Sequence, residues 1–189
     1  AFCLGNAFCP YWFSRVSEPI ASKVLSVGFP VIGNTLLMGI PWWLRRAVKH
    51  RLGDRWADAA LVFFWIAGER LHHAWDLQWP WLSLGNAFGT RPSWVQWYEI
   101  TGMLGGSLWV LLVNMLLNRV ISTWSVDLKR ARRLASVTVL VLLLPLCASL
   151  WRYGSYPMTK KGGGVEVVVV QPNVDPYTEK FSGDGVKQL

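Results

Sequence analysis

The sequence predicts a partial bundle of membrane-spanning α-helices followed by the first strand of a soluble domain. Hydrophobic residues make up 52% of the 189 positions and charged residues only 16%, against about 25% charged in ordinary soluble domains. Four windows are long enough to cross a bilayer, which takes about 20 residues per helix. A run of four valines at 167–170 has the composition of a strand buried on both faces. These three observations define the expected architecture.

The predicted membrane region covers residues 1–151, with helices expected at 24–44, 56–75, 98–118 and 134–151. The last window, LASVTVLVLLLPLCASLW, has no charged side chain and is the clearest of the four. The second window is the most polar. A polytopic, multi-pass membrane protein is therefore expected.

Residues 152–164 are expected to form a linker, and residues 165–189 the truncated start of the soluble domain. Three glycines at 162–164 and Pro172 bound the valine run, as turn residues commonly bound a strand. The 25 or so residues from Val165 onward are fewer than the roughly 50 of a self-contained domain. The chain also opens inside an apolar stretch, AFCLGNAFCPYWF. We therefore expect an internal fragment of a larger membrane protein.

Basic side chains predict the orientation of the helices, because short cytoplasmic loops retain Lys and Arg. Five lie between the first two windows and five between the last two: Arg45, Arg46, Lys49, Arg51 and Arg55, then Arg119, Lys129, Arg130, Arg132 and Arg133. Residues 76–97, between the second and third windows, contain a single Lys or Arg, Arg91. Both basic loops are thus expected in the cytoplasm, and the valine run across the membrane from it.

The net charge of +8 does not predict nucleic-acid binding, since the basic residues are split between two loops and no binding motif accompanies them. The three cysteines, Cys3, Cys9 and Cys147, are widely spaced and indicate neither a disulfide framework nor a zinc site. Cys147, inside a Leu-rich helix, is expected to be a small buried hydrophobe. No metal and no cofactor are expected.

The densest polar chemistry lies in residues 68–86, GERLHHAWDLQWPWLSLGN. Glu69 is placed toward the outer end of a predicted membrane helix, where ionisable groups are costly and usually face a partner or a watery cavity. His72 and Asp76 follow at helical spacings of three and four, so they can share its face. Three interpretations stay open: an interfacial hydrogen-bonded group, a substrate-facing polar cluster, and a metal site.

The next residues, Trp79, Pro80 and Trp81, combine a helix breaker with two large amphipathic rings at headgroup depth. One interpretation is an aromatic belt of the kind found at membrane interfaces. The other is a lipid-access surface, because the Pro-broken turn continues into Gly85 and Asn86 on the side where the soluble domain is predicted. Both stay open.

The chain resembles bacterial apolipoprotein N-acyltransferases over residues 56–181. The resemblance lies in the order of several features: Glu69 with Pro80 eleven residues on in an aromatic-Pro-Trp-Leu turn, then Gln96, Gly102, Gly105 and Asn114, then VVVVQPNVDPYTEKF. It implies an inner-membrane helical bundle joined to a periplasmic α/β nitrilase-like domain, an αββα sandwich. Many members of the family have Arg three residues after the glutamate, where this chain has His72.

The resemblance implies acyl transfer from a phospholipid donor to the N-terminal diacylglyceryl-cysteine of a lipoprotein, through a thioester acyl-enzyme. The family's catalytic Glu, Lys and Cys would lie beyond Leu189, so this chain alone is expected to be inactive. Its expected role is membrane anchoring and lipid access, with membrane lipids as partners. The expected substrate-binding residues are Glu69, His72, Trp79, Pro80 and Trp81.

Two other classes of protein stay open. Broken helices and the glycines at 102, 105 and 106 would equally suit a non-catalytic polytopic membrane protein or a transporter fragment, although such a protein does not require the valine run. A membrane-anchored nitrilase-like amidase would differ from an acyltransferase only in residues that this chain does not contain.

Overall fold

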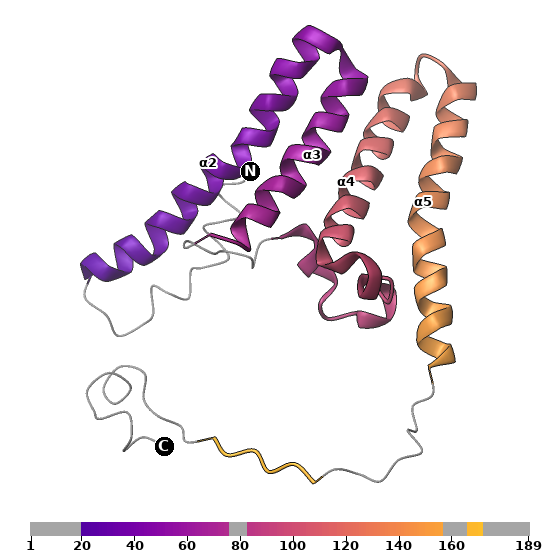
Figure 1. The fold of residues 1–189 in the computed structure, drawn as a ribbon. Helices are drawn as coiled ribbons and strands as arrows, with labels where there is room; N and C mark the ends of the chain where they lie inside the picture. The colour runs from indigo at the N-terminus through magenta and orange to yellow at the C-terminus, as the bar shows by residue number, and fades with distance from the viewer. Residues whose placement is uncertain (1–19, 76–82, 157–165, 172–189) are drawn as a thin grey trace. The chain divides into compact units, whose positions relative to one another are not determined.

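The computed structural model describes residues 20–75, 83–156 and 166–171, and the chain divides into two units, Ala1–Tyr156 and Pro157–Leu189. The described part of the first unit is helical, which confirms the helical part of the predicted architecture (Figure 1). Its elements are α2 (Ile20–Leu52), α3 (Asp54–His72), the 3-10 helices η3 (Leu84–Phe88) and η4 (Pro92–Trp94), α4 (Tyr98–Trp124) and α5 (Leu128–Ser155).

Each of the four predicted windows falls largely within one of these helices, but the boundaries differ. α2, α4 and α5 extend beyond their windows at one end or both. α3 ends at His72 rather than at residue 75, because the backbone N–H of His73 donates to the carbonyl of Arg70, 3.2 Å away, in a tighter turn. The extra length lies mostly in the polar ends, where hydrophobicity alone cannot define a helix boundary.

Two helices in the described part of the chain, α4 and α5, are long and apolar enough to cross a membrane by length and composition. Four spanning helices were expected. α3 carries both acidic and basic side chains within its 19 residues, among them Asp58 and Glu69, which lowers its hydropathy. Spans at 24–44 and 56–75 therefore stay a prediction.

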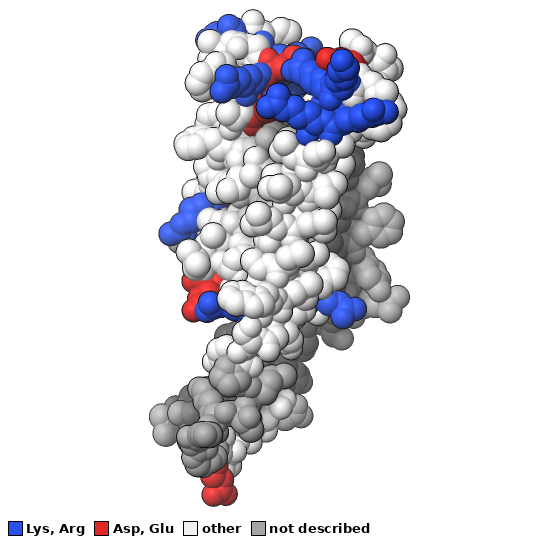
Figure 2. Space-filling view, turned by 90° about the vertical axis from the view of Figure 1, so that its right-hand side faces the viewer, with Lys and Arg blue, Asp and Glu red and all other residues white. Residues whose placement is uncertain are grey.

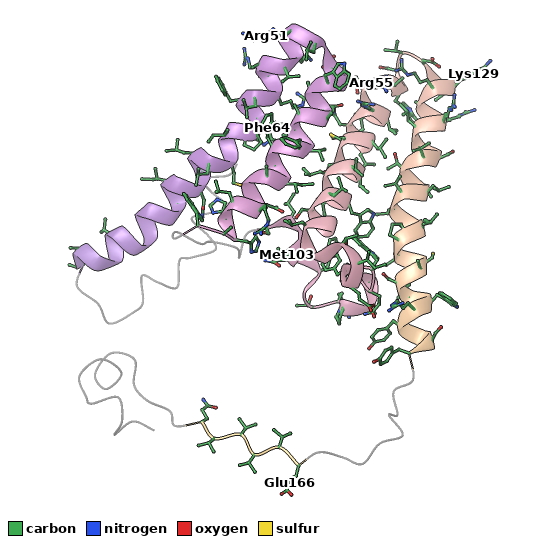
Figure 3. All side chains as sticks on the ribbon, in the orientation of Figure 1. Arg51, Arg55, Phe64, Met103, Lys129 and Glu166 are labelled. Carbon is green, nitrogen blue, oxygen red and sulfur yellow. The ribbon has the colours of Figure 1, made fainter. Side chains whose placement is uncertain are left out.

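The helices form two antiparallel hairpins, α2 with α3 and α4 with α5. Gly53 joins the first pair with φ of 84°, a left-handed conformation that favours glycine. Asp127 caps the N-terminus of α5, its carboxylate accepting from the backbone N–H of Arg130 at 2.9 Å. Figure 3 shows Arg51, Arg55 and Lys129 at the same end of the helices, so the two basic loops lie together.

Figure 2 shows the Lys and Arg side chains gathered at this end, next to a wide band of uncharged surface. We call it the basic end and define it as residues 45–58 and 119–133, which hold ten Lys and Arg side chains against three Asp. Within the basic end Lys49 pairs with Asp54 at 2.8 Å, and this contact lowers the pKa of the Asp54 carboxyl.

α5 packs on α4 through a stripe of small side chains. Ala131, Thr138 and Ser149 are its buried residues, and their spacings of seven and eleven place them on one helical face. The Trp109 indole of α4 reaches across and donates to the carbonyl of Val141 at 2.8 Å. Cys147 lies off this stripe and is exposed, so the expectation that it would be buried was wrong.

The predicted strand is not present in the described residues. Residues 166–171 are assigned no strand, and Val167–Val170 are 73–83% exposed. A strand is stabilised by hydrogen bonds to a neighbouring strand and by burial of its side chains, and the described residues supply neither. The nitrilase-like domain therefore stays a prediction.

Candidate functional site

Glu69 is the most deeply buried ionisable side chain in the described part of the chain, at 2% exposure. Its Oε1 accepts two hydrogen bonds of 2.9 Å, one from the indole Nε1 of Trp65 and one from the backbone N–H of Leu84. Trp65 lies one turn earlier on α3, and Leu84 is the first residue of η3. The carboxylate thus holds the connection after α3 against the end of that helix.

The second oxygen of this carboxylate has a different environment. Glu69 Oε2 is buried and has no hydrogen-bond partner within the described residues. The great majority of buried polar atoms in proteins have a hydrogen-bond partner, so an unpaired one marks a position where another group can donate. Glu69 thus combines a structural oxygen with one available to a ligand.

His72 lies one helical turn after Glu69 and is also buried. Its ring meets that of Trp75 edge to face, with centroids 5.4 Å apart, and its Nδ1 is buried without a partner in the described part of the chain. The neighbouring His73 points elsewhere, and its Nε2 lies 3.2 Å from Ser83 Oγ. The structure thus brings Glu69 and His72 together on α3, as predicted, while Asp76, Trp79, Pro80 and Trp81 lie outside the described residues.

η3 is fixed to α4 by a close backbone approach. The Tyr98 hydroxyl donates to the carbonyl of Gly85 at 2.9 Å, and the Gly85 N–H donates to the hydroxyl of Ser107, also at 2.9 Å. A Cβ on Gly85 would lie 2.0 Å from the carbonyl oxygen of Met103, and one on Gly106 would lie 3.0 Å from the Cα of Gly85. Only glycine permits this contact.

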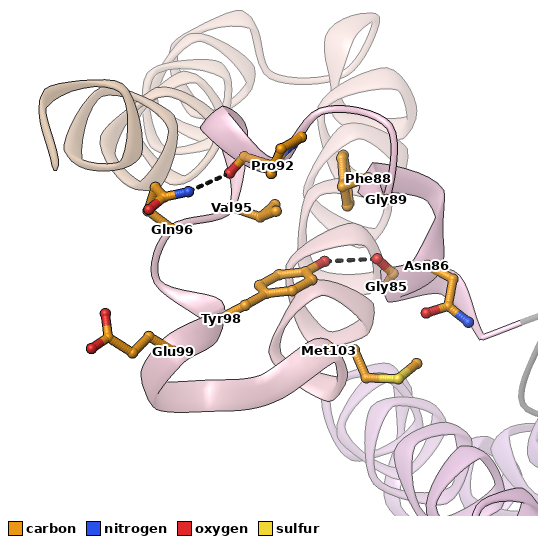
Figure 4. A pocket seen from close by; sticks show the side chains of 10 residues that line it. All are labelled: Gly85, Asn86, Phe88, Gly89, Pro92, Val95, Gln96, Tyr98, Glu99 and Met103. Carbon is orange, nitrogen blue, oxygen red and sulfur yellow. Dashed lines mark hydrogen bonds between the residues drawn. The ribbon is translucent and has the colours of Figure 1, made fainter. Parts of the chain in front are cut away.

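Gly102 makes the contact geometrically possible. Its φ of 63° and ψ of −173° interrupt α4 after its first turn, so the segment bearing Tyr98 leaves the line of the helix. A pocket of about 450 Å³ lies between this segment, η3 and η4 (Figure 4). Its lining includes Gly85, Asn86, Gln96, Tyr98 and Glu99, so it is a mixed polar and apolar hollow beside the Glu69 contacts.

At the basic end a second carboxylate joins three helices. Asp58 of α3 pairs with Arg45 of α2 at 2.9 Å and with Arg119 of α4 at 2.7 Å. Residues 58 and 69 are eleven apart on α3, about 16 Å at 1.5 Å per residue. The two carboxylates therefore occupy different depths of the same helix bundle.

The described residues contain no group of three or more His, Cys, Asp and Glu side chains able to hold a metal ion. Glu69 and His72 offer two ligands and structural zinc sites use four, while Asp76 of the predicted cluster lies outside the described residues. The contacts of Glu69 show a hydrogen-bonded group, and a substrate-facing role for this cluster stays a prediction.

Sequence reasoning did not identify Asp58, Tyr98 or Ser107. For Asp58 a signal was present: an ionisable residue inside a predicted membrane helix is the same feature that pointed to Glu69. Tyr98 and Ser107 gave no such signal, since their partners on η3 are 13 and 22 residues away in the chain.

Two helices apolar and long enough to cross a membrane, a basic end and a buried carboxylate at another depth suit a helical membrane protein. The family model that describes the apolipoprotein N-acyltransferase N-terminal domain matches residues 1–116. A curated apolipoprotein N-acyltransferase of Chlorobaculum tepidum is 30% identical over 141 residues, which are 74% of this chain. No solved structure matches the chain. The chain belongs to the apolipoprotein N-acyltransferase family.

The chain spans about a quarter, 26%, of the length of that curated relative. Membership of this family confirms the resemblance identified from the sequence and favours an acyltransferase over a transporter fragment.

Proposed function

We propose that this chain is part of the membrane half of an apolipoprotein N-acyltransferase and supplies anchoring and lipid access. In the proposed reaction a cysteine thiolate attacks an ester of a phospholipid, releasing the lysophospholipid and leaving a thioester. The amino group of a lipoprotein's diacylglyceryl-cysteine then attacks the thioester, forming an amide and returning the thiol. The attacking Cys, with its Glu base and Lys, belongs to a nitrilase-like domain C-terminal to this chain, so residues 1–189 alone have no acyl-transfer activity.

Both substrates are lipids confined to a membrane, so the chemistry must occur at a headgroup plane. The observation that carries the proposal is the buried Glu69, with one oxygen holding η3 and the other unpaired within the described residues. It lies away from the basic end, which we assign to the cytoplasm by the positive-inside rule. The Glu69 site then belongs to the periplasmic half of the bundle, on the same side as the nitrilase-like domain.

In this arrangement Glu69 and His72 line the approach of a lipid headgroup, and Trp79, Pro80 and Trp81 form its aromatic border. The headgroup and glycerol of a phospholipid, and the amide groups of a lipoprotein, present hydrogen-bond donors and acceptors that suit Glu69 Oε2 and His72 Nδ1. His72 stands where many relatives carry Arg, so this chain has an imidazole there in place of a permanently charged guanidinium.

The test is to express the full-length protein containing this chain in bacteria depleted of their own N-acyltransferase. Mass spectrometry of a reporter lipoprotein should then show three acyl chains instead of two. Topology reporters on the same protein should give a cytoplasmic signal after Arg133 and a periplasmic signal after Gly164. Diacylated lipoprotein in cells that contain the inserted protein would contradict acyl transfer, and reversed reporter signals would contradict the proposed location of the site.

A further inference from the structure

A second cavity, of about 560 Å³, lies between α2, α3 and α4. Its size is within the roughly 300–1,000 Å³ of small-molecule sites. The lining changes character along its length. Arg45 and Asp58 belong to the basic end and Asn118 directly precedes its second segment, while Leu61, Trp65 and Leu111 form the apolar part. Those three apolar side chains are also the buried core between α3 and α4.

Two charged side chains line the cavity, Arg45 and Asp58, and a third, Arg119, pairs with Asp58 without being a lining residue itself. One carboxylate, Asp58, serves two guanidinium groups, Arg45 and Arg119, so the trio carries a net charge of +1. Arg45 donates to Asp58 through Nη2 alone, and Arg119 through Nε and Nη2, whereas a guanidinium has five N–H donors. Ten basic side chains against three Asp at this end strengthen the positive potential.

A ligand that fits must therefore be anionic at one end and apolar at the other. The cavity lining on α4 runs from Val110 to Asn118, eight residues or about 12 Å at 1.5 Å per residue. This is a little less than the roughly 15 Å of one leaflet's hydrocarbon, half of the core thickness. Basic pockets between membrane helices on the cytoplasmic side are known to suit lipid phosphates.

We propose that this cavity binds one anionic phospholipid of the leaflet at the basic end. The phosphate lies by Arg45, Arg119 and the Asn118 amide, and the first part of an acyl chain lies along Leu61 and Leu111. The contact is charge-assisted on the phosphate and hydrophobic on the chain. This lipid is a bound component of the bundle, separate from the acyl donor, and its binding does not depend on the proposed acyl transfer.

The experiment uses the full-length protein, freed of lipid in detergent and titrated with dioleoyl phosphatidylglycerol or dioleoyl phosphatidylcholine under native mass spectrometry. Asn118→Asp places a carboxylate at the phosphate and should lower phosphatidylglycerol affinity by about tenfold or more, as like charges in contact disfavour binding. Arg46→Gln changes the total charge equally but removes an exposed side chain that does not line the cavity. It should lower affinity by less than about twofold.

A second pair of variants tests the apolar part without changing charge. Val110→Phe reduces the space beside Leu111 and should weaken phosphatidylglycerol binding, whereas Val137→Phe, on an exposed position of α5, should not. Equal effects of Asn118→Asp and Arg46→Gln would overturn the proposal, because they would indicate diffuse attraction only. Equal binding of the two lipids, or displacement of the lipid by an equal concentration of glycerol 1-phosphate, would also overturn it.

Discussion

Two buried carboxylates on α3, Asp58 and Glu69, hold different parts of the chain in different chemical ways. Asp58 uses both oxygens, each paired with an arginine from a neighbouring helix. Glu69 uses one oxygen, paired with two neutral N–H donors, and its Oε2 has no partner within the described residues. Both oxygens of Asp58 are occupied by contacts within the fold, whereas the second oxygen of Glu69 can accept a hydrogen bond from another molecule.

The partners also differ in how firmly they are held. The two arginines are long side chains that remain partly exposed, at 25% and 44%, so solvent and salt weaken their pairs with Asp58. Glu69 is bound by a backbone N–H and an indole that are both fixed by packing. The Glu69 site is therefore the more rigid of the two, as a binding site requires.

The largest effect is expected at Glu69. Glu69→Ala removes the acceptor of two hydrogen bonds, from Trp65 and Leu84, each loss costing about 1–3 kcal/mol, so the free energy of unfolding should fall by about 3 kcal/mol. Glu69→Gln keeps an accepting oxygen and should cost less than about 1 kcal/mol. Denaturant unfolding of the full-length protein in micelles measures both.

Measurements of acyl-transfer rate distinguish the roles of the two Glu69 oxygens. If Oε2 contacts substrate, Glu69→Gln should slow acyl transfer by about tenfold or more, the worth of one hydrogen bond to a charged group. Its unfolding would stay close to that of the wild type. Normal acyl transfer by the Glu69→Gln protein would show that Glu69, like Asp58, has a structural role only.

An intermediate effect is expected at Asp58. Asp58→Asn removes the charge from both ion pairs and leaves two arginines facing each other, which should lower the free energy of unfolding by about 2 kcal/mol. This figure is below the usual loss for buried pairs because both arginines are partly exposed. Acyl transfer per folded molecule should not change.

The control for Asp58 is Glu99→Gln, whose partner Arg152 is exposed, as is Glu99 itself. Exposed pairs contribute about 0–1 kcal/mol, so this variant should unfold nearly as the wild type does. Similar losses of unfolding free energy in the two variants would show that the burial of Asp58 does not strengthen its ion pairs.

The smallest effect concerns the glycine contact that supports the Glu69 site. Gly85→Ala would place a Cβ 2.0 Å from the Met103 carbonyl oxygen, and overpacking of this kind should cost about 1–2 kcal/mol. Gly68→Ala, in α3 with no atom within 4 Å of the added Cβ, should be neutral or stabilise the helix by up to about 1 kcal/mol. Equal thermal stability of the two variants would contradict the close approach of η3 to α4.

Several features could be predicted from the sequence because they depend on local composition. α4 and α5 are apolar along most of their length, and such segments are helical wherever backbone groups must be satisfied internally. Glu69 was singled out because a carboxylate in an apolar helix is energetically costly; the structure buries it, and its role in substrate binding stays a prediction. The family resemblance was likewise carried by residues in a fixed order, and the comparisons confirm it.

Other features depend on contacts between residues far apart in the chain. Asp58 and Arg119 are 61 residues apart, and Gln96 meets the Ser149 hydroxyl across 53 residues. The hydrophobic periodicity of a sequence gives no information on contacts between residues so far apart in the chain. For residues 167–170 the composition predicts a strand, but a strand also requires a neighbouring strand to pair with, and the described residues do not provide one.

The sequence by itself determined which segments are helical, where the positive charge gathers and which family the chain belongs to. These follow from hydrophobicity, charge and residue order, which are properties of the chain read locally. The tertiary structure alone decided that one oxygen of Glu69 holds Leu84, that Tyr98 and Ser107 fix Gly85, and that Asp58 joins three helices. Hydrogen bonds and ion pairs have ranges of a few ångströms, so only the packing of the helices and of η3 against one another selects which of many possible partners meet.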